Sequence, residues 1–128
     1  MTIPTTVSVD PTDGRPADAP APVKAWRPPM GWNSWDSYGT TITEQEVLDN
    51  ARFMAEHLKD AGWDTLVIDA GWFDPNAHAH GYSDGTPLCI DAYGRRIPDE
   101  QRFPSAADGK GFGPLADAVH RLGLKLGV

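Results

Sequence analysis

Tryptophans and a carboxylate lie where the chain is expected to leave two successive β-strands. Trp32 and Trp35 lie in Met-Gly-Trp-Asn-Ser-Trp, and Asp69 and Trp72 lie in Leu-Val-Ile-Asp-Ala-Gly-Trp. The face of a tryptophan ring can stack on the apolar face of a sugar ring. A carboxylate can accept strong, charge-assisted hydrogen bonds from the hydroxyls of the same ring. These residue types, at the ends of two strands, predict a sugar-binding site.

A short strand and an amphipathic helix are expected between the two groups. Residues 30–33 form the strand, and the helix runs from Thr43 to about Asp60. Thr43 and Glu46 have the spacing of a capping box, in which each side chain bonds the other residue's backbone N–H. Gly62 suits the position just after a helix end. Apolar residues recur at steps of three and four and predict one buried face: Val47, Ala51, Met54 and Leu58.

The second strand is predicted at 63–69 and is followed by a long irregular segment. Its Leu-Val-Ile centre is apolar without alternation, as expected for a parallel strand covered on both faces. Residues 71–101 are rich in glycine, aspartate and proline, and loops this long in compact domains are usually functional. Within this segment, 87–90 and 94–97 are expected to pair as a small hairpin. The shorter segment 37–41 is also expected to be a loop.

The alternation of strands and helices indicates the fold class. A second helix is expected to begin near Phe112, with Pro114 in its first turn, and to end at Gly123, before a third strand at 124–128. The order β-α-β-α-β implies an α/β fold with a parallel sheet and right-handed crossovers. A complete (β/α)8 barrel typically needs about 250 residues. We therefore expect residues 26–128 to be the amino-terminal portion of such a barrel.

The bulk composition narrows the range of partners and compartments. With 18 acidic against 11 basic residues, the formal charge is −7, which argues against nucleic acid and anionic membrane surfaces as partners. No stretch is apolar enough to span a bilayer. Residues 1–25, rich in proline and threonine, are expected to be a disordered lead without the character of a signal peptide. Because Cys89 is the only cysteine, a reduced, cytoplasmic setting is expected, and the oligomeric state is left open.

Six blocks of sequence carry a more specific signal. They are Arg-Pro-Pro-Met-Gly-Trp-Asn-Ser-Trp at 27–35, the Thr-Glu start of the next helix, Leu-Val-Ile-Asp-Ala-Gly-Trp at 66–72, Asp91 with Gly94, Arg102-Phe103-Pro104, and Ala118-Val119-His120 with Gly123-Leu124-Lys125-Leu126-Gly127. In this order they resemble the amino-terminal part of family 27 glycoside hydrolases, the α-galactosidase or melibiase family. The resemblance covers about residues 27–128.

The resemblance implies a (β/α)8 catalytic barrel followed by a β-sandwich domain, and retaining hydrolysis of α-glycosides without cofactor or metal. The nucleophile and the acid/base, two aspartates about 5 Å apart, are then expected beyond Val128, so no catalytic residue is assigned here. Trp35 matches the family's stacking tryptophan, Asp69 the first of two adjacent sugar-binding aspartates, and Trp72 the tryptophan after them. Ala70 stands in place of the second aspartate. A glycone other than galactose, such as a pentopyranose or another hexose, is therefore an alternative.

Each of these residues also has a purely structural interpretation. Trp32 is expected to pack beneath the first strand rather than to contact sugar. Asp69 could cap the turn after it, and Trp72 could belong to the core as well as to the site wall. His78 and His80 have a spacing that permits a metal pair, but no third ligand has support, so we interpret both as solvated.

Two other classes of protein fit part of the pattern. One is a carbohydrate-binding chain with no catalysis of its own, which would differ from the enzyme only in the sequence beyond Val128. The other is a different (β/α)-barrel enzyme, such as an isomerase with a phosphate site, which would carry glycine-rich loops and basic residues at its strand ends. The strand ends of this sequence carry tryptophan and aspartate instead, which favours the hydrolase.

Overall fold

The computed structural model describes residues 28–79, 81, 85 and 87–128, so the lead predicted at 1–25 and the start of order predicted at Trp26 lie outside it. Within the described residues, three parallel strands form one sheet in the order β1-β2-β3. They are β1 (Gly31–Asn33), β2 (Thr65–Val67) and β3 (Lys125–Gly127). Trp32 is the partner of Leu66, and Leu66 is the partner of Leu126. The predicted α/β fold with a parallel sheet is confirmed.

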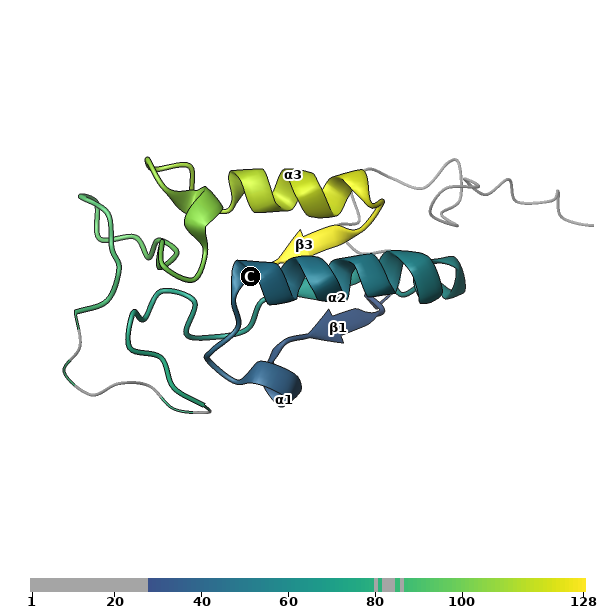
Figure 1. The fold of residues 1–128 in the computed structure, drawn as a ribbon, viewed down its shortest axis with the longest axis horizontal. Helices are drawn as coiled ribbons and strands as arrows, with labels where there is room; N and C mark the ends of the chain where they lie inside the picture. The colour runs from purple at the N-terminus through teal and green to yellow at the C-terminus, as the bar shows by residue number, and fades with distance from the viewer. Residues whose placement is uncertain (1–27, 80, 82–84, 86) are drawn as a thin grey trace, which may run out of the picture.

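Two longer helices connect these strands and pack against the sheet. They are α2 (Glu44–His57) and α3 (Gly113–Arg121), and Figure 1 shows them side by side. Their apolar faces meet the central strand in one core, which contains Val47, Ala51 and Met54 from α2, Leu115 and Val119 from α3, Leu66 and Ile68 from β2 and its end, and Ile42, Phe103, Ala106 and Leu124 from the connections. The predicted order β-α-β-α-β is therefore confirmed, and this core fixes where the strand ends point.

Helix α2 begins with the local contacts that the sequence predicts but ends earlier than predicted. The backbone N–H of Thr43 donates to Glu46 Oε2 over 2.8 Å, and the N–H of Glu46 donates to Thr43 Oγ1 over 3.4 Å, so both arms of the capping box form. The helix ends at His57, three residues before the expected Asp60, because a 3₁₀ turn (Lys59–Ala61) takes over there. Gly62 follows at a left-handed φ of 91°, a conformation that suits glycine.

The segment after β1 is a short helix, α1 (Trp35–Tyr38), where the sequence led us to expect a loop at 37–41. At the start of this helix, the side-chain oxygen of Asn33 accepts the backbone N–H of Trp35 over 2.8 Å. Such side-chain bonds to a backbone amide two residues later are typical of asparagine. Gly39 ends the helix with a positive φ of 55°. The expectation of a loop at 37–41 was therefore wrong for its first two residues.

The strands are shorter than predicted, and β2 covers 65–67 instead of 63–69. The N–H of Ile68 still donates to the carbonyl of Gly127 over 3.0 Å, but the N–H of Asp69 turns to a side chain instead of the ladder. A 3₁₀ turn at Pro104–Ala106 was not predicted. None of the helices in the described part of the chain is long and apolar enough to cross a membrane.

The connection from β2 to Pro104 is irregular, as predicted. Its described residues form no regular strand or helix, only isolated bridges. The small hairpin is confirmed, since Ile90 pairs with Arg96 and the N–H of Ile97 donates to the carbonyl of Cys89 over 3.0 Å. Figure 1 shows this connection extending to one side of the sheet, away from the helix α2.

Candidate functional site

An open hollow lies at the edge of the sheet where β1 and β2 end. Its volume is about 490 Å³, and it is lined by Asn33, Trp35, Asp36, Asp69 and Ala70. All five residues lie at the end of β1 or shortly after β1 and β2, and parallel strands bring their carboxyl ends to one edge. In α/β folds and barrels this edge is where ligands bind.

The carboxylate of Asp69 is held by two neighbours at the floor of this hollow. Its Oδ2 accepts from Asn33 Nδ2 over 2.7 Å, and its Oδ1 accepts from the N–H of Ala70 over 2.7 Å. Its own backbone N–H donates over 2.9 Å to the hydroxyl of Ser34, which is fully buried. An ionised carboxylate has about four lone-pair sites, so the carboxylate is fixed in place and retains acceptor capacity toward a ligand.

Asn33 joins the carboxylate to the aromatic residue of the site. Its Nδ2 donates to Asp69 and its Oδ1 accepts from the backbone N–H of Trp35. One amide side chain therefore fixes the distance between the end of β2 and the start of α1. Asn33 was not assigned from the sequence. Its position at the last residue of a strand, between two tryptophans, was the signal that could have identified it.

The remaining lining residues give the hollow its chemical character. Trp35 is half-buried, so part of its ring faces solvent, and Asp36 is exposed beside it. Ala70 contributes a methyl group where a second carboxylate was expected. One flat apolar surface and two carboxylates suit a ligand that is apolar on one face and carries hydroxyls at its edge.

Trp72 is not among the residues that line the hollow. Its ring meets Phe73 and Phe112 edge to face, with ring centroids 5.1 and 5.2 Å apart, and it packs against the core. Trp32 also packs against the core, and its ring lies 6.0 Å from that of Tyr38. The structure therefore brings Trp35 and Asp69 to one hollow and leaves Trp72 in an aromatic cluster.

The histidine pair in the long connection is only half described. His80 lies outside the described residues, and His78 Nδ1 lies 3.2 Å from the carbonyl of Asn76. Within residues 28–79, 81, 85 and 87–128, no three or more His, Cys, Asp or Glu side chains form a group that could hold a metal ion.

Known glycosidases resemble this chain in sequence. The α-galactosidase of Cyamopsis tetragonoloba is 36% identical over 102 residues, which are 79% of this chain and 20% of that protein. The α-galactosidase of Coffea arabica is 32% identical over 102 residues, which are 79% of this chain and 22% of that protein. No protein-family model matches the sequence.

Solved structures add the fold to this resemblance. A family 27 β-L-arabinopyranosidase from Geobacillus stearothermophilus is 54% identical, with a TM-score of 0.76 over 77% of this chain and 23% of that chain. Sequence and fold place this chain with the family 27 glycoside hydrolases. The α-galactosidase I of Mortierella vinacea also matches, at 34% identity and a TM-score of 0.58 over 77% of this chain and 21% of that chain.

The family 27 match covers a limited part of each relative. The chain spans 20% of the Cyamopsis enzyme and 23% of the Geobacillus enzyme. Its three strands and two connecting helices correspond to the beginning of the (β/α)8 barrel. The hollow at the strand ends therefore lies on the face of the barrel where such folds place their active sites.

Proposed function

We propose that this chain forms part of the glycone-binding wall of a retaining glycoside hydrolase that cleaves O-glycosidic bonds in carbohydrates. The observation that carries the proposal is the position of Trp35 and Asp69, which line one hollow at the carboxyl edge of the parallel sheet. The formal charge of −7 also disfavours a polyanion as the ligand of this hollow.

In this proposal the residues of the chain bind and orient the sugar, and the bond-breaking pair comes from elsewhere in the barrel. Asp69, fixed by Asn33 and Ala70 N–H, accepts hydrogen bonds from ring hydroxyls, and Trp35 stacks on the ring. Because these groups are fixed before the sugar arrives, binding costs little reorganisation. The nucleophile and the acid/base are expected on strands beyond Val128, about 5 Å apart as retention requires. No cofactor or metal is part of this mechanism.

Ala70 sets the expected choice of glycone. A carboxylate at this position could bond hydroxyls that a methyl group cannot. β-L-Arabinopyranose has the ring configuration of α-D-galactopyranose but lacks the exocyclic hydroxymethyl group, so it presents one hydroxyl fewer. A methyl group at position 70 suits the smaller sugar, and the 54% identical Geobacillus relative is a β-L-arabinopyranosidase. We therefore propose a pentopyranoside as the preferred substrate.

An α-galactoside is the second candidate. It is favoured by the curated relatives, which are α-galactosidases at 36% and 32% identity. The two substrates differ at one carbon of the ring, so a single assay can compare them.

The test is a panel of nitrophenyl glycosides hydrolysed by the full-length product of the gene that encodes this chain. We expect the β-L-arabinopyranoside to give the higher kcat/KM and the α-galactoside to be second. Ala70→Asp should raise the activity on the α-galactoside relative to the pentoside, whereas Ala61→Asp, at an exposed position outside the hollow, should leave the ratio unchanged. An unchanged ratio in Ala70→Asp would contradict the role of position 70.

The catalytic part of the proposal has a simpler test. Sequencing the coding DNA past codon 128 should reveal a fourth strand that ends in an aspartate. An immediate stop codon would favour a carbohydrate-binding chain without catalysis and would contradict the hydrolase.

We also propose that the protein works in a reducing, cytoplasmic compartment. The support is that Cys89, which is half-buried, has no second thiol within these 128 residues with which to form a disulfide. Fractionation of the source cells with an antibody against this chain should recover the protein with the cytoplasm, and recovery from the medium would contradict this.

A further inference from the structure

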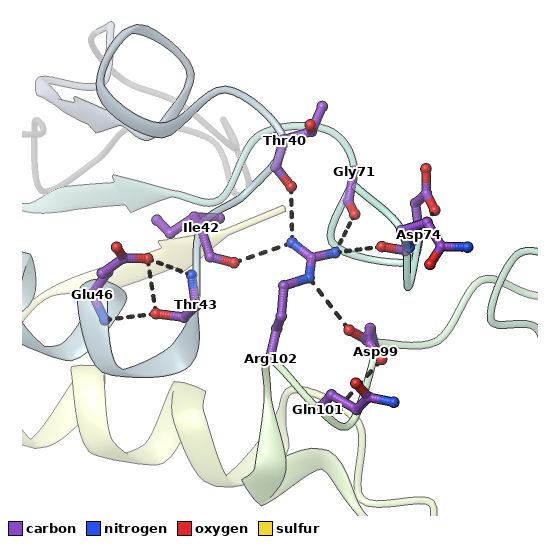
Figure 2. A network of polar contacts seen from close by, with 10 residues as sticks. Thr40, Ile42, Thr43, Glu46, Gly71, Asp74, Asp99, Gln101 and Arg102 are labelled. Carbon is purple, nitrogen blue, oxygen red and sulfur yellow. Dashed lines mark hydrogen bonds and ion pairs between the residues drawn. The ribbon is translucent and has the colours of Figure 1, made fainter. Parts of the chain in front are cut away.

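Arg102 lies at the centre of a polar network that involves the segments after the site residues, and its side chain is 14% exposed. Its two terminal nitrogens donate to four backbone carbonyls, and its Nε donates to Asp99 Oδ2 over 3.3 Å. Nη1 lies 2.8 and 3.2 Å from its two acceptors and Nη2 lies 2.6 and 2.9 Å from its own, which are the carbonyls of Thr40, Ile42, Gly71 and Asp74. A guanidinium has five N–H donors, and each has a partner here (Figure 2).

The four carbonyls belong to the two segments that carry the site residues. Thr40 and Ile42 follow α1, the helix that begins with Trp35, and Gly71 and Asp74 follow Asp69. Figure 2 shows the guanidinium between these two backbones. Arg102 itself lies 62 residues from Thr40 and 31 from Gly71 along the chain. It therefore joins three distant segments at one point.

The two segments also touch each other beside the guanidinium. Gly71 has a φ of 90°, and a Cβ built on it would lie 2.5 Å from the Cβ of Thr40. Thr40 is fully buried and its hydroxyl donates to the carbonyl of Ala79 over 2.7 Å. The two segments are therefore closely packed at this point. The bonds from Arg102 to both of them hold the segment after Trp35 against the segment after Asp69.

Asp99 extends the network to the aromatic cluster. It is 5% exposed, and its backbone N–H donates to the carbonyl of Trp72 over 2.9 Å. Its carboxylate faces Arg102, so the buried positive charge has a buried partner, which such a charge requires. The segments that follow Trp35 and Asp69, and the backbone next to Trp72, are thus connected to one side chain through Arg102 and its partner Asp99.

We infer that Arg102 is a positioning residue for the glycone-binding wall: it holds Trp35 and Asp69 in the geometry that a sugar ring requires. The inference rests on the proposed function. The acceptors of Arg102 named above all lie outside the lining of the hollow, so its effect passes through the two backbones that it bonds. Lysine cannot replace it. The donors of a guanidinium are spread over three nitrogens in one plane and here reach carbonyls of two segments, whereas an ammonium carries its three donors on a single nitrogen.

The test uses Arg102→Lys and Arg102→Met in the full-length gene product, with Arg52→Lys and Arg52→Met as matched controls. Arg52 is 57% exposed on α2 and pairs with Asp49 of the same helix. Kinetics on the best glycoside of the panel give KM and kcat, and quenching of tryptophan fluorescence by the free monosaccharide gives its Kd. We expect KM and Kd to rise roughly ten- to hundredfold in Arg102→Met, and less in Arg102→Lys, because displaced binding groups hold the sugar less well. The kcat should fall as well, since the bonds from Asp69 strengthen toward the transition state.

A merely structural Arg102 would give a different result. Its loss would lower the fraction of folded protein and therefore the apparent kcat. KM and Kd, which depend only on the molecules that are folded, would then match the wild type. Wild-type values of KM and Kd would overturn the inference. The Arg52 variants should match the wild type in KM and Kd.

A second readout does not depend on activity. In protein labelled with 5-fluorotryptophan, the ¹⁹F resonance of Trp35, assigned through Trp35→Phe, should shift in Arg102→Lys and stay in place in Arg52→Lys. An unmoved Trp35 resonance would overturn the inference. A wild-type protein that hydrolyses no glycoside would instead overturn the proposed function, and the Trp35 resonance would still decide the positioning.

Discussion

The segments after β1 and β2 both reach the candidate site, but different kinds of contact hold them. Residues 34–43 after β1 form a short segment whose two ends are held by near neighbours. Asn33 bonds an amide two residues on, and Thr43 and Glu46 bond each other three residues apart, while Arg102 bonds the middle of the segment at Thr40 and Ile42. Residues 68–112 after β2 form a long segment that contains Arg102, and its start is held by the bonds from Arg102 to the carbonyls of Gly71 and Asp74, 31 and 28 residues away. The ends of the first segment are therefore built locally, whereas the start of the second segment and the junction between the two depend on tertiary contacts.

This contrast between the two segments predicts unequal effects of mutation. A change at an end of the first segment should cost what one local bond contributes, whereas a change at the junction of the two segments should disturb both. The site residues themselves should affect catalysis more than stability.

The largest expected effect is on catalysis by the full-length gene product. Asp69→Ala removes a charged acceptor for sugar hydroxyls, a bond that contributes about 1.5–3 kcal/mol. We expect kcat/KM to fall roughly hundredfold or more, since such bonds strengthen toward the transition state. Asp64→Ala, which removes a carboxylate from the other end of the same strand, serves as the control. Equal losses in the two variants would show that Asp69 has no special role.

The junction of the two segments should give the largest loss of stability. Gly71→Ala places a methyl group 2.5 Å from Thr40 Cβ at a φ of 90°. Left-handed backbone costs about 1–2 kcal/mol in a residue with a Cβ, and overpacking costs about 1–3 kcal/mol more. Gly94→Ala is the control: its φ of 76° is also left-handed, but no atom lies within 4 Å of the added methyl group. Chemical denaturation should therefore show a clearly larger loss for Gly71→Ala, and equal losses would mean that the junction is loose.

A smaller loss is expected at the locally built start of α2. Thr43→Ala removes one arm of the capping box, which typically costs about 1 kcal/mol. Ser37→Ala, at an exposed position in α1, should change the free energy of unfolding by no more than about 0.5 kcal/mol. A loss of several kcal/mol in Thr43→Ala would show that the start of α2 depends on more than its local capping box.

The smallest effect concerns the hairpin within the second segment. The pKa of Asp91 lies below its ordinary value of 3.8, chiefly because its carboxylate accepts the backbone N–H of Arg95, with further bonds from the Arg95 side chain and Tyr93 N–H. A lowered folded pKa means that the contribution to stability is complete above the ordinary pKa and is lost as the pH falls through the folded pKa. The NMR titration of the Asp91 carboxyl carbon should have its midpoint below 3.8. Because the backbone bonds remain when the guanidinium is removed, Arg95→Gln should retain part of the lowering of the Asp91 pKa. A midpoint that returns to the ordinary value would contradict this.

The same division between local and distant contacts explains what the sequence could predict. The capping box at Thr43 and the Ile90–Arg96 hairpin depend on residues close in sequence, and the structure confirms them. The network of Arg102 could not be predicted, because its acceptors are backbone carbonyls, and a carbonyl carries no signature of residue type. The short helix α1 was missed because one asparagine side chain decides it.

The candidate site was predicted unevenly for the same reason. Trp35 and Asp69 follow strands that end at one edge of a parallel sheet, so topology alone brings them together. Trp72 lies three residues further on, where the turn at Gly71 and the ring of Phe112 decide its direction, and no spacing rule covers that contact. Asn33 was overlooked, although it fixes both of the residues that the sequence did identify.

Binding of the glycone in the hollow between Trp35 and Asp69 can be observed directly. The measurement is a crystal structure of the full-length gene product soaked with L-arabinose, and with galactose in a parallel crystal. We expect a sugar ring stacked on Trp35, with hydroxyls at hydrogen-bond distance, about 2.5–3.0 Å, from the carboxylate of Asp69, and the open side of the pentose ring facing the methyl group of Ala70. A sugar bound elsewhere in the barrel, with no contact to Trp35 or Asp69, would contradict the proposed role of both residues.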